Sequence, residues 1–211
     1  MLLEWQRIIK EETEKSEMTT FPTEDGKSTY PYVILPFDSR INPRFMKAVI
    51  EGMKWMLKDE LKKATVIFLA EAKGFLLTPL VEATGLDIAL IRKRNYRTSD
   101  QIVIEQRKAY KEKAGKNLMY CVGLKKDDKP LIIDDIVSSG GTTIGIIKAL
   151  EERGFDIVGV GSVYERENGL ENVKKETGYD VKALARFEVI DKKLPSGETI
   201  KKPIVSRFFK I

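Results

Sequence analysis

The chain contains no histidine and a single cysteine, Cys121, among its 211 residues. Without histidine, any general acid or base must be a carboxylate, a lysine, a tyrosine, the substrate itself or water. One cysteine excludes an internal disulfide, and its place in the apolar run 118–122 predicts a core residue. The two absences therefore exclude histidine-based catalysis and a disulfide-stapled scaffold.

Long apolar runs are also absent. No run approaches the length of a membrane span, and charged residues are too frequent in residues 1–15 for a signal peptide. A net charge of +5 could indicate a nucleic-acid partner, but lysine and glutamate are interspersed and no aromatic-basic signature accompanies them. We therefore expect a cytoplasmic protein with a charge-rich surface and no membrane or nucleic-acid partner.

The composition favours one globular domain over residues 1–211, because 42% of the residues are hydrophobic and 33% are charged. Apolar β-rich runs alternate with amphipathic segments along the chain. This alternation predicts an α/β fold with a mostly parallel sheet and helices on both faces. The expected strands cover 30–35, 65–69, 87–91, 131–133, 156–163 and 181–189, and the expected helices 2–15, 42–63, 75–83, 143–150 and 169–177.

The most informative segment runs from residue 131 to residue 143. A short apolar strand is followed by Asp134 and Asp135, at the strand end where open α/β sheets bind ligands. Their carboxylates suit vicinal hydroxyls or a hydrated magnesium ion. A small, hydroxylated loop then opens a helix, an arrangement that favours a phosphate dianion. That loop comprises Ser138, Ser139, Gly140, Gly141 and Thr142. A Walker-type loop is excluded, because no Gly-Lys-Ser/Thr follows the required spacer.

A second group of polar residues follows two other expected strands. Lys73 follows the strand 65–69, while Arg92 and Lys93 follow the strand 87–91. Because carboxyl ends of parallel strands meet at one edge, these cations should face the same crevice as the acidic pair. With the backbone donors of residues 72–74, they could bind a pyrophosphate group. For the run 92–94, a solvated loop edge is an equally good interpretation.

The segment 131–143 resembles the phosphoribosyl pyrophosphate signature of the type I phosphoribosyltransferases. The resemblance implies that fold, with a core over about 42–190 and a small hood from about 20–41 and 185–211. It also implies that Asp134 and Asp135 hold the ribose hydroxyls and are catalytic, while residues 138–142 hold the 5-phosphate. Pyrophosphate would lie against Ala72, Lys73, Gly74, Arg92 and Lys93. Magnesium carried by the substrate, with the acidic pair reaching it through water, is the implied cofactor.

Within this family, the middle of the chain looks most like the adenine phosphoribosyltransferases. The matching residues are Lys73-Gly74-Phe75, Gly85-Leu86 and Ile91-Arg92-Lys93-Arg94, whereas residues 30–40 and 163–179 look more like archaeal 6-oxopurine enzymes. Ser138 stands where hypoxanthine-guanine enzymes usually have Asp, and Glu165 stands near a position where they tend to have Lys. The missing Asp at Ser138 favours adenine. A carboxylate accepts a hydrogen bond from an amino group and repels a carbonyl oxygen, so Glu165 favours adenine as well. Glu165 as a surface partner of Arg166 is equally compatible.

We therefore expect magnesium-dependent transfer of phosphoribosyl to adenine, giving AMP and pyrophosphate in purine salvage. Hypoxanthine or guanine is the alternative base, orotate is a weaker one, and a regulator that binds phosphoribosyl pyrophosphate without catalysis stays open. The base pocket is expected to include Phe37, Arg40, Val137 and Glu165. A loop over 96–116 should close over the reacting centre through Tyr110, Lys111 and Lys113, although the position before Gly115 lacks the usual Glu-Tyr. The resemblance also implies a homodimer.

Overall fold

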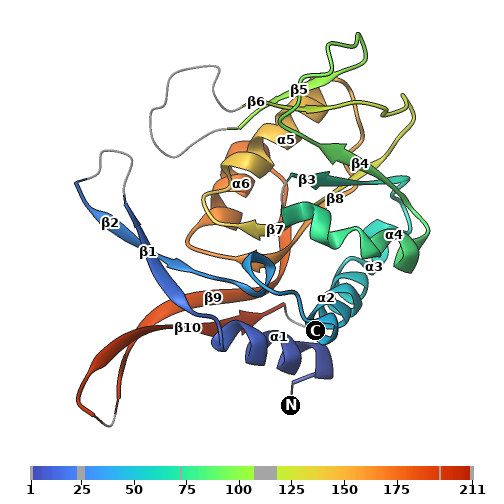
Figure 1. Cartoon of the computed structure of the whole chain (residues 1–211). Coiled ribbons are helices and arrows are strands. Elements are labelled where there is room, and N and C mark those ends of the chain that lie inside the picture. Colours follow the sequence, from blue (N-terminus) through green and yellow to red (C-terminus); the bar gives the residue numbers. More distant parts are fainter. Residues whose placement is uncertain (1, 23–26, 72, 107–117, 195, 210–211) are drawn as a thin grey trace.

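A six-stranded sheet in the order β10-β9-β8-β7-β3-β4 forms the centre of the molecule. The computed structural model describes residues 2–22, 27–71, 73–106, 118–194 and 196–209. Five strands run parallel, and β10 pairs antiparallel with β9 (Figure 1). The strands are β3 (Val66–Ala70), β4 (Asp87–Ile91), β7 (Pro130–Val137), β8 (Gly159–Glu165), β9 (Val181–Lys193) and β10 (Thr199–Phe208). The expected α/β fold with a mostly parallel sheet is confirmed.

One face of the sheet is covered by helices from the first half of the chain. They are α1 (Glu4–Glu14), α2 (Pro43–Met56), α3 (Lys58–Leu61) and α4 (Pro79–Thr84), with the short helices η1 (Pro36–Asp38) and η2 (Lys73–Leu77). Asn42 caps α2, because its side chain accepts a hydrogen bond from the backbone N–H of Arg44 at 2.9 Å. Trp5, Ile8 and Ile9 of α1 are buried in the core on this face, which also includes residues of α2 and β8.

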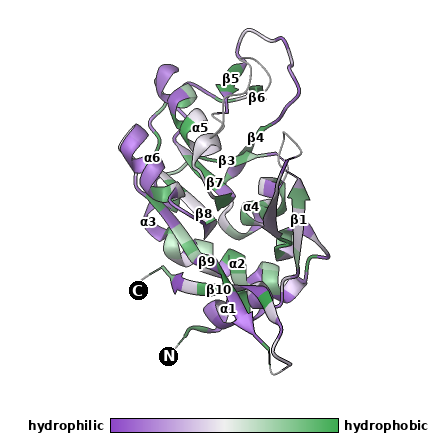
Figure 2. Cartoon of the chain, turned by 90° about the vertical axis from the view of Figure 1, so that its left-hand side faces the viewer, coloured by the Kyte–Doolittle hydropathy of each residue, from purple (hydrophilic) through white to green (hydrophobic). Residues whose placement is uncertain are grey.

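The other face carries α5 (Gly141–Glu152), α6 (Gly169–Thr177) and a hairpin of β5 (Ile102–Glu105) and β6 (Leu118–Cys121). Gly145 allows β5 to lie directly on α5, since a Cβ atom there would collide with the backbone carbonyl of Glu105. Figure 2 shows that α6 is largely hydrophilic, as expected of an outer helix with one buried stripe. No helix in the described part of the chain is long and apolar enough to cross a membrane.

The sequence prediction differs from the structure in several element boundaries. The expected helix 42–63 ends at Met56 and resumes as α3, and the expected helix 75–83 is divided into η2 and α4. Pro79 begins α4, which agrees with the preference of proline for the first helical position. The expected strand 156–163 begins only at Gly159. The chain continues after β9 into β10, a strand that was not predicted.

The segment 18–38 lies beside this sheet. It contains a hairpin of β1 (Met18–Pro22) and β2 (Thr29–Val33), followed by η1. Figure 1 shows the hairpin projecting from the same side of the molecule as the tip of the β9–β10 hairpin. The segment returns to the core at Phe37, whose ring packs edge-on against Phe45 of α2. It therefore brings η1 close to η2.

A shared irregularity crosses three strands, near the carboxyl ends of β7 and β8. Pairing skips Asp135, Val163 and Leu184, which lie opposite one another in the parallel ladders. The side chains change face at this line, as shown by Val163 and its neighbour Tyr164, which both pack into the same core. We call this line of three residues the crease. It places Asp135 outside the regular ladder of the sheet.

Candidate functional site

The acidic pair lies near the carboxyl end of β7. The strand continues through both residues to Val137, so the expectation that it would end at Asp134 was wrong. The cause is pairing with β8, which includes Asp134 and resumes at Ile136 and Val137 beyond the crease. Both residues nevertheless lie near the carboxyl end of β7, as predicted.

Both carboxylates are buried, with residue exposures of 9% for Asp134 and 6% for Asp135. Burial and the neighbouring carboxylate of Asp135 raise the pKa of Asp134 well above its usual value. Burial also raises the pKa of Asp135, and the ammonium group of Lys73 opposes that rise. Among the residues that the structure describes, no hydrogen-bond donor reaches Asp135 Oδ2. One buried oxygen of the pair, Asp135 Oδ2, therefore has no hydrogen-bond donor among these residues.

The loop after β7 leads directly into a helix N-terminus. Gly140 is the residue before α5 and has a φ of 85°, a left-handed conformation that glycine adopts without strain. The backbone N–H of Gly141 points toward Ser139 Oγ at 3.5 Å. The unpaired N–H groups of the first turn and the dipole of this 12-residue helix favour an anion at the loop. The predicted residues 138–142 therefore lie together, in the turn after β7 and the first residues of α5.

The first residues of α6 pack against this loop. A Cβ atom on Gly169 would collide with the carbonyl oxygens of Val137 and Ser138, so only glycine allows this close approach. Asn172 Nδ2 donates to the carbonyl oxygen of Ser139 at 3.1 Å. Gln106 Nε2 donates to the hydroxyl oxygen of Thr142 at 2.5 Å. The loop is therefore fixed by contacts on both sides.

Lys73 of η2 reaches toward the acidic pair. Its Nζ atom lies 3.9 Å from Asp135 Oδ2 and 2.6 Å from Asp38 Oδ1, and it donates to Tyr32 Oη at 3.1 Å. Sequence reasoning selected Lys73 but missed Tyr32 and Asp38. The available signal was Asp38 itself, a carboxylate placed just after a β-rich run, as Asp134 is.

The other predicted cations are held at the ends of β3 and β4. Arg92 Nε lies 3.5 Å from Glu71 Oε2, and the backbone N–H of Lys93 donates to the same oxygen at 3.2 Å. The guanidinium of Arg92 also lies over the ring of Phe75, 5.9 Å from its centroid. Gly74 is buried in η2, and Ala72 lies outside the described residues.

Of the four residues expected in a base pocket, Val137 and Glu165 are paired neighbours on β7 and β8, and the other two lie elsewhere. Phe37 and Val137 are buried in the cores on opposite faces of the sheet, and Arg40 is exposed beside α1. Glu165 is buried and forms ion pairs with Arg186, at 3.0 Å, and with Arg207. Its carboxylate therefore already has two partners, and Arg166 pairs instead with Glu167 at 3.4 Å.

Tyr110, Lys111 and Lys113, expected in a closing loop, lie outside the described residues. The structure describes the two strands that flank this stretch. They pair as an antiparallel hairpin from Ile102 opposite Cys121 to Glu105 opposite Leu118. The strand β5, at residues 102–105, lies within the stretch 96–116 that was expected to be a loop.

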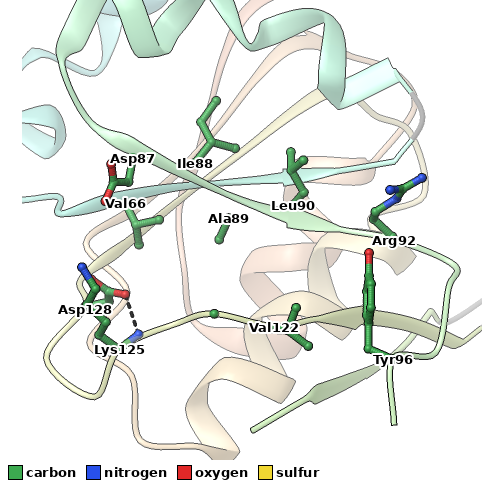
Figure 3. Close-up of a pocket in the computed structure, with 11 residues that line it drawn as sticks. Val66, Asp87, Ile88, Ala89, Leu90, Arg92, Tyr96, Val122, Lys125 and Asp128 are labelled. Atoms are coloured by element: carbon green, nitrogen blue, oxygen red, sulfur yellow. Dashed lines mark hydrogen bonds between the residues drawn. The ribbon is translucent and has the colours of Figure 1, made fainter. Parts of the chain in front are cut away.

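A pocket of about 420 Å³ lies elsewhere, along the edge strand β4 (Figure 3). Its walls include Asp87, Leu90 and Arg92 on one side and Val122 and Asp128 on the other. The loop that forms the second wall is closed by a hydrogen bond, which the backbone N–H of Lys125 donates to Asp128 at 2.8 Å. The acidic pair and Lys73 do not line this pocket, so we do not assign it to the same site.

Comparison with known proteins identifies a family model and curated relatives. The model described as "Phosphoribosyl transferase domain" matches residues 40–188. A hypoxanthine/guanine phosphoribosyltransferase of Methanothermococcus okinawensis is 41% identical over 169 residues, covering 80% of this chain and 90% of the relative. One of Methanobacterium lacus is 34% identical over 172 residues, covering 80% and 87%.

Solved structures share the fold at lower identity. Adenine phosphoribosyltransferase of Thermoanaerobacter pseudethanolicus has a TM-score of 0.62 at 20% identity, covering 80% of this chain and 95% of the other. The enzyme of Saccharomyces cerevisiae, complexed with adenine and an imino-altritol bisphosphate, has a TM-score of 0.63 at 17% identity, covering 86% and 99%. At these identities the likeness shows the fold alone.

Proposed function

This chain belongs to the phosphoribosyltransferase family, and we propose that it transfers the phosphoribosyl group of phosphoribosyl pyrophosphate to a purine base. The observation that carries the proposal is the succession of a buried acidic pair, a small loop and a helix N-terminus from β7 to α5. A polyol followed by a phosphate complements that order of groups. The relatives that are 34% and 41% identical are named for this class of reaction.

Each end of the sugar phosphate has a proposed partner. The 5-phosphate lies in the loop 138–142, where backbone N–H groups and the α5 dipole stabilise its charge. The ribose hydroxyls donate to Asp134 and Asp135, and Asp135 Oδ2 is an acceptor without a donor among the described residues. When pyrophosphate leaves the anomeric carbon, positive charge develops on the ribose, and the nearby carboxylates stabilise it. We propose Arg92, Lys93 and the backbone at Gly74 for the pyrophosphate.

Magnesium fits this site as an ion carried by the substrate. No group of three His, Cys, Asp or Glu side chains able to hold a metal occurs in the described residues. The acidic pair can instead accept hydrogen bonds from the water shell of a magnesium ion. When bound, the ion would neutralise charge on the leaving pyrophosphate.

We propose hypoxanthine or guanine as the accepting base. The argument for adenine required a free Glu165 carboxylate, but Arg186 and Arg207 bind that group. The two relatives with the 6-oxopurine name are 34% and 41% identical, whereas the adenine enzymes that share the fold are 17% and 20% identical. Adenine remains the second candidate because Ser138, and not aspartate, begins the phosphate loop.

The test is release of pyrophosphate from phosphoribosyl pyrophosphate and magnesium, with hypoxanthine, guanine, adenine or orotate supplied separately. Release with hypoxanthine or guanine, and formation of IMP or GMP, is the expected result. Release with adenine alone would replace the 6-oxopurine proposal by adenine transfer.

Two controls make the assay decisive. The Asp135→Asn variant should release little pyrophosphate with any base, which assigns the release to this site. If the wild-type protein is silent with every base yet binds phosphoribosyl pyrophosphate tightly, transfer is wrong and a non-catalytic regulator is the better account. Binding of neither substrate nor base would reject the site assignment.

A further inference from the structure

The ammonium group of Lys73 has partners in three secondary-structure elements, β2, η1 and β7. Its strongest partner is Asp38 of η1, at 2.6 Å, and Tyr32 of β2 accepts from it at 3.1 Å. The third direction leads to Asp135 Oδ2 at 3.9 Å. An ammonium group has three N–H donors, so two are satisfied by the segment 18–38 and one faces the acidic pair.

The partners of Lys73 are themselves fixed. Tyr32 donates its hydroxyl hydrogen to Asp38 Oδ1 at 3.0 Å, and the backbone N–H of Leu35 donates to Asp38 Oδ2 at 3.1 Å. The Asp38 side chain is 14% exposed and that of Lys73 is 31% exposed. An ion pair with this degree of burial and additional hydrogen bonds is stronger than a surface pair. The geometry thus holds the ammonium group in one place.

Asp135 needs a cation in that place. Its carboxylate is buried next to the carboxyl group of Asp134, and a buried negative charge is costly unless a cation lies near it. Within the described residues, Lys73 is the cation that forms an ion pair with either carboxyl group. The negative charge of Asp135, and its position as an acceptor, therefore depend on where Lys73 lies.

We propose that Asp38 and Tyr32 are positioning residues for the ribose site, which act by holding Lys73 beside Asp135. This inference rests on the proposed assignment of the acidic pair to the ribose hydroxyls. It gives Lys73 a different role from that of a pyrophosphate ligand. It also links η1, which precedes Asp135 by about 100 residues in the chain, to the binding of the sugar.

The two roles of Lys73 predict opposite behaviour toward two simple ligands. Ribose 5-phosphate has the hydroxyls and the 5-phosphate but no pyrophosphate, and inorganic pyrophosphate has no sugar. If Lys73 only binds pyrophosphate, its loss weakens pyrophosphate binding and leaves ribose 5-phosphate unaffected. If Lys73 supports Asp135, its loss weakens the binding of ribose 5-phosphate.

The experiment is titration calorimetry of the full chain with ribose 5-phosphate alone and with magnesium pyrophosphate alone. For Asp38→Asn and Lys73→Gln we expect the dissociation constant of ribose 5-phosphate to rise about tenfold, the usual scale for losing one charge-assisted contact. Tyr32→Phe should raise it about threefold, because the ion pair remains. Pyrophosphate affinity of Asp38→Asn should stay within about twofold, since its Lys73 ammonium is intact.

Asp59→Asn is the matched control, because it removes an aspartate from an exposed ion pair with Lys62 at 3.3 Å. It should bind both ligands as the wild type does. A variant that merely unfolds would lose affinity for both ligands and show a lower thermal midpoint, so the ratio of the two affinities is the diagnostic quantity.

Unchanged ribose 5-phosphate affinity in folded Asp38→Asn and Lys73→Gln would overturn the inference alone, because the ribose site would still be intact. Equal losses for both ligands in folded variants would also overturn it. A wild-type protein that binds neither ligand would instead reject the proposed function, and the inference with it. The two failures are therefore distinguishable.

Discussion

The β7–α5 segment and the Lys73 network form neighbouring parts of one site, but the chain constructs them differently. The first takes its acidic pair, loop and helix N-terminus from residues 134–142 in succession. The second joins Tyr32, Asp38 and Lys73 from three elements through side-chain contacts. The backbone fixes the first, and ionic contacts between distant segments fix the second. In the proposed function, this difference separates residues that bind the ligand directly from residues that position them.

The largest expected effect is the loss of turnover when Asp135 in the β7–α5 segment is replaced. Asp135→Asn removes a carboxylate proposed to stabilise the ribose cation, and loss of one such group typically lowers turnover about 100- to 1,000-fold. The thermal midpoint should change little, because the buried charge itself costs free energy on folding. Steady-state kinetics and thermal unfolding measure both effects. Comparable losses in activity and stability would reject the ribose role.

The next effect tests whether the backbone fixes the loop. Gly140→Ala forces a side chain into a residue with a φ of 85°, and its Cβ would lie 2.9 Å from the carbonyl oxygen of Gly169 and from Val173 Cγ2. Gly123 has the same φ of 85° with no atom within 4 Å, so Gly123→Ala is the matched control. Gly140→Ala should lower the free energy of unfolding by about 1–3 kcal/mol more than the control. Chemical denaturation gives both values; equal losses would show that the loop has room to shift.

A smaller effect tests a contact between distant segments outside the site. Tyr164 in β8 shares a hydrogen bond of 2.6 Å with Thr13 in α1, and both side chains are fully buried. Tyr164→Phe should lower the free energy of unfolding by about 1 kcal/mol, because Thr13 keeps its bond to the carbonyl oxygen of Ile9. Tyr30→Phe, at an exposed tyrosine, is the control and should be neutral. A neutral Tyr164→Phe would mean that this link is replaced by water.

The smallest effect concerns Cys121, at the base of the β5–β6 hairpin. Burial raises the pKa of its thiol to about 12, so almost no thiolate exists at neutral pH. A thiol reagent at pH 8 should therefore label the folded protein far more slowly than the urea-unfolded protein, without loss of activity. Mass spectrometry over time gives the two rates. Rapid labelling of folded protein would show that β6 opens from the sheet.

The comparison also explains how much could be predicted from the sequence. The strand 87–91 and the helix 169–177 were predicted at their observed bounds, because local periodicity determines them. The acidic pair and the loop were found because all their residues are neighbours in the chain. The pairing of Asp38 and Tyr32 with Lys73 was not found, since no local pattern records a contact across 35 or 41 residues.

Pairing between strands also overruled two local interpretations. The expected end of β7 at Asp134 followed from the change to acidic residues, but its ladder with β8 continues to Val137. Glu165 was expected either to contact the base or to pair with Arg166 at the surface, because the neighbouring sequence offered no other partner. Its actual partners, Arg186 and Arg207, come from β9 and β10, and β10 was not predicted.

The crease has a consequence for how this protein can change during evolution. Beyond Asp135, Val163 and Leu184, the strands β7, β8 and β9 present their side chains in an exchanged order. A deletion of one residue in one of these strands would reverse its faces beyond that point, while its neighbours kept theirs. Insertions and deletions at this line are therefore tolerable only as matched sets. Recombination between homologues should preserve the three strands as one inherited block.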